Sequence, residues 1–189
     1  METHQKSDLR LVMKDRRSAL FQKYPEAGEK IAPLFFDAFP FPLHTRLGAY
    51  WPVGSELDIR PLLRELVKRG FRCALPCMIP LGIVFREWDP AVALSEGKFQ
   101  LFEPPSTAPL LIPDVLLVPL LAFDRQGHRL GYGQGYYDQY LSHHKVLTIG
   151  VGFKEQEIEE VPHQDHDVSL DYILTEAGVI DLTQFPQKT

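Results

Sequence analysis

The chain has 189 residues, of which 44% are hydrophobic and 24% charged, a balance typical of a globular domain and not of a disordered or fibrous protein. A formal net charge of -5 argues against a broad nucleic-acid surface, although it does not exclude a local basic pocket. No apolar run is long enough to span a bilayer, and the charged residues 1–17 do not resemble a secretory signal. We therefore expect one domain over residues 1–189, monomeric and cytoplasmic, that binds neither nucleic acid nor membrane.

Apolar periodicity predicts alternating helices and strands. Ser7 is placed to cap a helix that runs to about Tyr24, and a second helix follows Pro25. A third helix is expected between Asp58 and Gly70. The predicted strands cover 45–51, 71–76, 82–88, 114–123, 146–153 and 171–175, with a short helix at 135–144. This alternation is typical of an α/β fold, a three-layer sandwich around a mostly parallel sheet, in which ligands bind beyond the carboxyl ends of the strands.

Cys73 and Cys77 are the only cysteines of the chain. Their spacing is not that of a redox pair, and two thiols make an incomplete zinc site. We expect them to be reduced and packed in the interior.

The stretch RLGYGQGYYDQYL, residues 129–141, carries three glycines at alternating positions directly before a predicted helix. Glycines let a backbone adopt positive φ and approach a ligand closely, and a helix N-terminus adds free amide groups that favour an anion. Arg129 could add a bidentate contact to a phosphate. The spacing matches neither the dinucleotide fingerprint nor the Walker A motif, so a Rossmann cofactor and a P-loop NTPase are both poorly supported.

Several polar side chains near this loop have two possible roles. Asp138 falls in the first helical turn, where it can complement the helix dipole or hold a magnesium ion. Of Tyr136 and Tyr137, one is expected in the core, while the other could stack on a planar heterocycle. His163 and His166 have a spacing that arises easily by chance, and a polar surface turn is the expected interpretation.

The motif FDRQGHRLGYGQGYYDQYL resembles the signature of the 5-formyltetrahydrofolate cyclo-ligase family, also called methenyltetrahydrofolate synthetases. The resemblance extends over residues 6 to about 175 and includes, in order, KSDLR, AYWPVGSELDIRPLL, GKFQLFEPP, GFKEQ and HDVSLDYILT. It implies conversion of 5-formyltetrahydrofolate to 5,10-methenyltetrahydrofolate with MgATP as co-substrate and release of ADP and phosphate. In that reaction the formyl oxygen is phosphorylated, N10 attacks the activated carbon, and phosphate leaves.

The resemblance also implies roles for individual residues. The ATP site would comprise Lys6, Arg10, Arg129, Leu130, Gly131, Tyr132, Gly133, Gln134, Gly135, Tyr136 and Tyr137. Trp51, Glu56 and Tyr136 would contact the folate, Asp138 and Asp167 would hold Mg²⁺, and Arg129 and Tyr136 would act in catalysis. Without the resemblance, Glu56 could equally be a charge at a helix N-terminus.

This chain departs from some family members at two loop positions, since Tyr132 and Gln134 stand where those members carry Arg and Lys. Leu121 also stands where a small residue is common. Two alternatives to the cyclo-ligase reaction remain: a folate- or nucleotide-binding protein of the same fold without this turnover, or a ligase for another formylated substrate.

Overall fold

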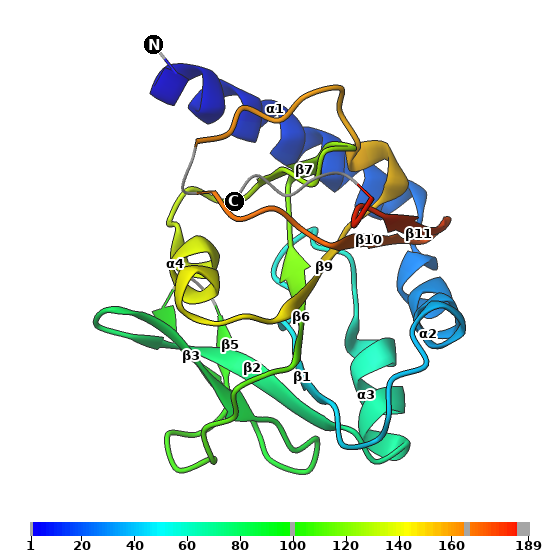
Figure 1. Ribbon diagram of the computed structural model, residues 1–189, viewed down its shortest axis with the longest axis vertical. Helices are drawn as coiled ribbons and strands as arrows, with labels where there is room; N and C mark the ends of the chain where they lie inside the picture. Colours follow the sequence, from blue (N-terminus) through cyan, green and yellow to red (C-terminus); the bar gives the residue numbers. More distant parts are fainter. Residues whose placement is uncertain (1, 99–100, 165–166, 185–189) are drawn as a thin grey trace.

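A seven-stranded sheet forms the centre of the computed structural model, which describes residues 2–98, 101–164 and 167–184 (Figure 1). Its strands lie in the order β11-β10-β9-β6-β1-β2-β3. The five inner strands are parallel, while β3 and β11 pair antiparallel at the two edges. Their bounds are β1 Arg46–Gly48, β2 Arg72–Ile79, β3 Gly82–Glu87, β6 Val115–Pro119, β9 Leu147–Val151, β10 Tyr172–Thr175 and β11 Gly178–Asp181.

Helices cover both faces of the sheet and so complete three layers. The helices are α1 Glu2–Lys23, α2 Ala27–Ala38, α3 Arg60–Lys68 and α4 Tyr136–His143, with a 3-10 turn, η2, at Lys154–Gln156. Strand β6 shows how the layers are built, because Leu117 packs into the cluster that contains α2 and α3, whereas Leu116 and Val118 pack with α4. All three leucine and valine side chains are fully buried, as expected for a central parallel strand. The predicted α/β sandwich is confirmed.

Helix α1 lies across the end of the sheet at which the parallel strands finish (Figure 1). Met13 on α1 packs in a third, smaller cluster with Leu121, Ala122 and Leu130. The last two belong to a short hairpin formed by β7 Ala122–Phe123 and β8 Arg129–Leu130. This hairpin carries the chain from β6 directly to the glycine loop. A further small pair, β4 Ser95–Glu96 and β5 Phe102–Glu103, lies beside β2.

Most predicted elements are confirmed, and the differences have simple causes. Ser7 does not cap the first helix, because α1 begins at Glu2 and no proline or glycine interrupts residues 2–23. The apolar run 114–123 bends after Pro119, so it forms β6 and β7 instead of one strand. The last strand, β11, was not predicted. Both cysteines are free and buried, as expected, and burial raises the pKa of Cys73 to about 12 and of Cys77 to about 11.

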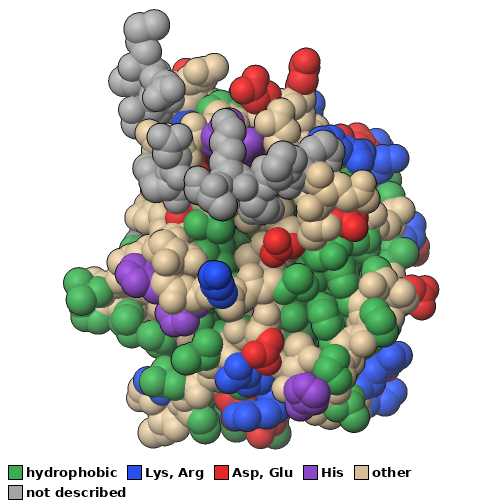
Figure 2. Space-filling view, in the orientation of Figure 1, with side chains coloured by type: hydrophobic (Ala, Val, Ile, Leu, Met, Phe, Trp, Pro, Cys, Tyr) green, Lys and Arg blue, Asp and Glu red, His purple; other side chains and the backbone are tan. Residues whose placement is uncertain are grey.

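The surface is mixed in character. Figure 2 shows acidic and basic side chains interspersed on the visible face, which therefore offers no continuous basic surface. The β2–β3 hairpin projects from the body, and Ile79 and Leu81 at its turn are exposed (Figure 1). Of the helices in the part of the chain that the structure describes, none has the length and apolar character needed to span a bilayer.

Candidate active site

A cavity of about 1320 Å³ opens beyond the carboxyl ends of β1 and β6. It is lined by α1, by residues 50–56 after β1, by the glycine loop and the start of α4, and by residues 160–164 with Asp167. Sites for one small ligand measure roughly 300–1,000 Å³. The cavity therefore has room for two substrates, and it lies where ligands bind in parallel α/β sheets.

The glycine loop has two positions that require glycine. Gly133 has φ +93° and Gly135, the N-cap of α4, has φ +69°, a region that residues with side chains rarely adopt. The Arg10 guanidinium lies against Gly133, since a Cβ placed there would be 3.0 Å from Cζ of Arg10. Arg10 Nε also donates a hydrogen bond to the Gly131 carbonyl at 3.0 Å. Both glycines are thus needed for a loop that wraps around a cation.

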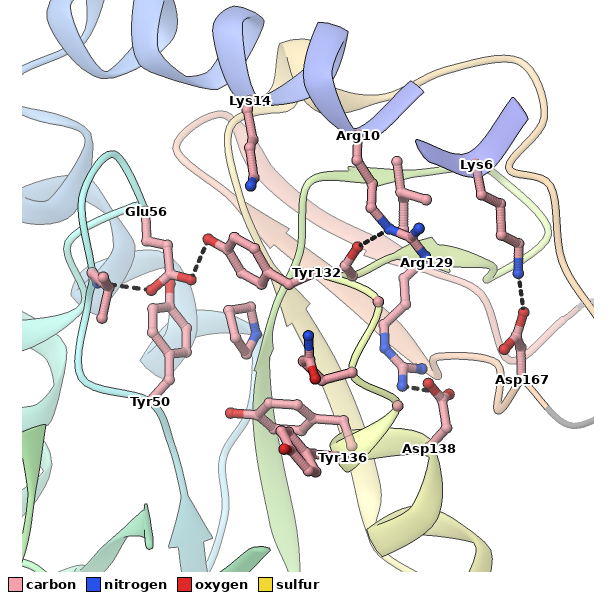
Figure 3. A pocket seen from close by; sticks show the side chains of 18 of the residues that line it. Lys6, Arg10, Lys14, Tyr50, Glu56, Arg129, Tyr132, Tyr136, Asp138 and Asp167 are labelled. Carbon is pink, nitrogen blue, oxygen red and sulfur yellow. Dashed lines mark hydrogen bonds and ion pairs between the residues drawn. The ribbon is translucent and has the colours of Figure 1, made fainter. Parts of the chain in front are cut away.

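Helix α1 presents a basic face to the cavity (Figure 3). Lys6 and Arg10, both predicted for the nucleotide, lie beside the loop, and Lys6 Nζ forms an ion pair of 2.8 Å with Asp167. Lys14 and Arg17 continue the same face and were not predicted. Their spacing of four and then three residues from Arg10 is a helical periodicity that would have identified them.

Arg129 and Asp138 join the two ends of the glycine loop. Arg129 Nη2 lies 2.6 Å from Asp138 Oδ1, and the same oxygen accepts the Val168 N–H at 3.1 Å. Arg129 Nη1 donates to the Val168 carbonyl. The Arg129 side chain is only 5% exposed, so much of its charge is balanced by Asp138 within the protein.

A buried carboxylate lies at the other side of the cavity. Glu56 is 6% exposed, and its Oε1 accepts the Tyr132 hydroxyl at 2.7 Å while Oε2 accepts the Val53 N–H at 2.8 Å. Burial raises the pKa of this carboxyl, against the two hydrogen bonds and the charge of Arg17, which lower it. Trp51 lines the cavity nearby, with its ring 5.8 Å from that of Trp88. Glu56 precedes α3 by four residues and faces the cavity, so it is not a helix-terminal charge.

Comparison with known proteins identifies the family. The model of the 5-formyltetrahydrofolate cyclo-ligase family matches residues 2–176. The chain belongs to this family.

Individual relatives agree with the cyclo-ligase assignment. A 5-formyltetrahydrofolate cyclo-ligase of Escherichia coli is 28% identical over 179 residues, which cover 89% of this chain and 98% of that protein. A probable 5-formyltetrahydrofolate cyclo-ligase of Caenorhabditis elegans is 40% identical, with 93% and 94% covered. A solved 5,10-methenyltetrahydrofolate synthetase of Aquifex aeolicus superposes with a TM-score of 0.83 at 30% identity, covering 97% of this chain and 96% of that chain. The chain is an enzyme of the cyclo-ligase family.

The tyrosines of the glycine loop occupy different environments. Tyr136 and Tyr137 both line the cavity and both pack against the cluster that contains α4, so neither is purely a core residue. Tyr132 is 41% exposed, yet its hydroxyl is enclosed between Glu56 and Arg17. Leu130 is 1% exposed and packs under α1, which leaves its backbone, and not its side chain, for any contact with a nucleotide.

The two carboxylates predicted to bind Mg²⁺ are each paired with a cation of the chain itself, Asp138 with Arg129 and Asp167 with Lys6. Among the residues that the structure describes, no three His, Cys, Asp or Glu side chains are grouped as metal ligands. Magnesium bound with a nucleotide usually takes only one or two carboxylates, together with phosphates and water. The donor set therefore fits a metal that is carried largely by the nucleotide.

Two buried residues support the walls of the cavity without lining it, and neither was predicted. Asp124 is fully buried and accepts the His128 and Val161 backbone N–H groups as well as His128 Nδ1, thereby fixing the β7–β8 turn. Gln156, in the GFKEQ stretch, accepts the Phe153 N–H and donates to the carbonyls of Leu120 and Leu121. Asp124 leaves a signal in the sequence, because it directly follows the apolar run 114–123, whereas Gln156 stands among charged residues and leaves none.

His163 lines the cavity and is not part of a simple surface turn. Its ring stacks on His128 with centroids 3.5 Å apart and planes 6° apart, and His128 is paired with Asp124. His166 lies outside the described residues. Of the two histidines in the predicted HxxH surface turn, His163 belongs to the wall of the cavity.

Proposed function

We propose that the chain converts 5-formyltetrahydrofolate to 5,10-methenyltetrahydrofolate with ATP, releasing ADP and phosphate. The observation that carries the proposal is the single cavity shared by the cation-lined glycine loop and the buried carboxylate of Glu56 (Figure 3). A reaction between a nucleotide and a pterin needs both kinds of subsite within reach of each other.

The nucleotide subsite is proposed at the glycine loop. Backbone amides of residues 130–137, the N-terminus of α4, and the cations Lys6 and Arg10 would bind the phosphates. The Arg129 charge lies beneath the loop, where it would stabilise charge that develops during phosphoryl transfer. Such transfer depends on positioning and electrostatics more than on a protein nucleophile, so the loop residues and cations can promote it without forming a covalent intermediate.

The folate subsite is proposed between the Glu56 carboxylate and Trp51, with Tyr136 toward the formyl group. An ionised carboxylate accepts hydrogen bonds from two neighbouring N–H groups, which suits the edge of a pterin ring. The indole of Trp51 offers an apolar plane against which a ring can pack. Burial of Glu56 strengthens these contacts because little water competes for them.

The chemistry follows from the poor leaving ability of a formamide oxygen. We propose that the formyl oxygen takes the γ-phosphoryl group of ATP and that ADP departs. N10 then attacks the formyl carbon, the carbon–oxygen bond breaks to release phosphate, and N10 loses its proton to give the methenyl bridge. The loop cations bind the anionic phosphate groups throughout, which lowers the free energy of charge transfer.

Magnesium is proposed as the metal of this enzyme, held by Asp138 and Asp167 together with the nucleotide. When bound, it would neutralise phosphate charge and fix the orientation of the phosphates. We further propose that the chain binds ATP and the folate, that residues 1–189 form one domain, and that the protein is a cytoplasmic monomer.

The test is an absorbance assay for methenyltetrahydrofolate formed from 5-formyltetrahydrofolate, with and without ATP and Mg²⁺. ATP-dependent product with stoichiometric ADP supports the proposal. A folded protein that binds ATP and yet forms no product would contradict it and favour another formylated substrate.

A further inference from the structure

We propose that Tyr132 and Arg17 are positioning residues for the folate, because together they orient Glu56 in its subsite. The Tyr132 side chain would then serve the folate and not the nucleotide, although its backbone belongs to the phosphate-binding loop. The inference rests on the proposed function, and in particular on Glu56 as the acceptor of pterin N–H groups.

The geometry is a chain of three side chains from three separate segments, and Figure 3 shows the contact between Tyr132 and Glu56. Arg17 Nη1 on α1 donates to the Tyr132 hydroxyl at 2.5 Å, and this hydroxyl donates to Glu56 Oε1 at 2.7 Å. Arg17 Nε donates to Ser55 Oγ at 3.2 Å, next to Glu56 in sequence. The hydroxyl therefore has both a donor and an acceptor, and its proton is directed toward the carboxylate.

The same contacts explain why Glu56 can be buried as a charge. The side chains of Arg17 and Glu56 are 6% and 7% exposed. The distance from Arg17 Nη1 to Glu56 Oε1 is 3.8 Å, which is too long for a direct hydrogen bond. The Tyr132 hydroxyl bridges this gap. A buried carboxylate without donors and a nearby opposite charge would be costly and would tend to become protonated. A protonated Glu56 would be a poorer acceptor for a pterin.

Tyr132 orients the Glu56 carboxylate and still leaves it able to accept further hydrogen bonds. Oε1 accepts from Tyr132 and Oε2 from the Val53 N–H, so rotation of the carboxylate is restrained at both oxygens. Each oxygen has lone pairs for a second hydrogen bond. The carboxylate is consequently oriented before substrate arrives and can still accept the two N–H groups of a ligand, which lowers the entropic cost of binding.

The ring of Tyr132 is itself held in place from α1. Lys14 Nζ lies 5.7 Å and Arg17 Cζ 5.4 Å from the ring centroid, distances suited to cation–π interaction. The neighbouring glycines, Gly131 and Gly133, let the loop backbone pass Arg10 while the Tyr132 side chain turns toward Glu56. The loop thus contributes to both subsites.

The groups that face Glu56 come from four segments. They are Arg17 on α1, Tyr132 in the loop, Tyr50 after β1 and Tyr137 on α4. Burial together with the negative charge of Glu56 raises the pKa of all three tyrosines, so they remain neutral throughout the range in which Glu56 titrates. Arg17 supplies the positive charge among these groups.

The experiment compares Tyr132→Phe with wild type in steady-state assays of the full chain. Loss of one hydrogen bond to a buried charge should raise the KM for 5-formyltetrahydrofolate about tenfold and leave the KM for ATP unchanged. The acidic limb of the pH profile of kcat/KM for the folate should move to higher pH, because Glu56 loses a hydrogen bond that favours its ionised form. Tyr24→Phe is the matched control, since Tyr24 also donates its hydroxyl to a glutamate, Glu155, but outside the cavity.

A double-mutant cycle separates this role from a general loss of structure. In the Glu56→Gln background, Tyr132→Phe should have little further effect on folate binding, because its target is already gone. Additive effects, a larger change in the KM for ATP, or an unshifted pH profile would each overturn the inference. If wild type forms no product, the proposed function fails, and calorimetric binding of 5-formyltetrahydrofolate to the same four proteins still decides the role of Tyr132.

Discussion

Arg129 and Asp138 form a 2.6 Å ion pair that joins the residue before the glycine loop to the first turn of the helix after it. Val168 contacts both partners through its backbone, so the strand-side end of the loop, α4 and the segment before β10 meet at this pair. The pair has a structural role in any case. Whether Asp138 also binds magnesium is a separate question that kinetics can answer.

We expect Asp138→Asn to lower the apparent affinity for Mg²⁺ by at least about tenfold, because an amide is a weaker ligand for a hard cation than a carboxylate. The amide oxygen can still accept from Arg129 and Val168, so the fold should survive. Titration of activity with Mg²⁺ at saturating ATP measures the effect. Asp114→Asn, which alters an Asp–Arg pair away from the cavity, is the control. An unchanged Mg²⁺ requirement would leave Asp138 with only its structural role.

Arg10→Ala should raise the KM for ATP about tenfold while changing the KM for the folate less. Arg10 lies against Gly133 and donates to the Gly131 carbonyl, so its removal takes a positive charge and a support from the glycine loop, the proposed nucleotide subsite. Arg16→Ala is the matched control on the same helix, because Arg16 is exposed and does not line the cavity. A larger effect on the folate would show that this part of α1 belongs to the other subsite.

The sequence alone predicts the fold well because the signals are local. Hydrophobic periodicity identifies α2 and α3, and the apolar stretch 114–123 identifies the central strand, although its bend at Pro119 depends on the hairpin that follows. The resemblance to the family brings together the loop, Lys6, Arg10 and Glu56, and the structure places all of them around one cavity. Local patterns and family motifs therefore suffice to group residues that line one cavity.

What the sequence does not predict are contacts between distant segments. The Arg17–Tyr132–Glu56 chain joins residues 115 and 76 positions apart, and neither pairing leaves a local pattern. The stack of His128 on His163 is another example, since it depends on how the β7–β8 turn packs against the segment before β10. The direction of the side chains in the glycine loop cannot be predicted from the sequence either. Tyr132 is surrounded by glycine-loop residues in sequence, yet its side chain points to Glu56 (Figure 3).

The three loop glycines should differ in their tolerance of alanine. Gly133 and Gly135 have positive φ, which costs an alanine about 1–2 kcal/mol, whereas Gly131 has no positive φ and open space around its Cβ position. We expect the ligand-free Tm to fall by about 2–8 °C in Gly133→Ala and Gly135→Ala. Gly131→Ala should change it little. Equal losses at all three positions would contradict the backbone explanation and point to a shared effect of side-chain bulk.

Glu56→Gln should weaken folate binding and also change its pH dependence. Burial raises the pKa of this carboxyl above the ordinary value of 4.5, so as the pH falls it becomes protonated earlier than an exposed glutamate. In wild type, kcat/KM for the folate should therefore decline on the acidic side with a pKa above 4.5. In Glu56→Gln the KM for the folate should rise at least about tenfold, and this acidic limb should be absent.

Glu160→Gln, at an exposed position of the same cavity, is the control and should keep the wild-type pH profile. Persistence of the acidic limb in Glu56→Gln would assign it to another group and remove Glu56 as the acceptor of the pterin.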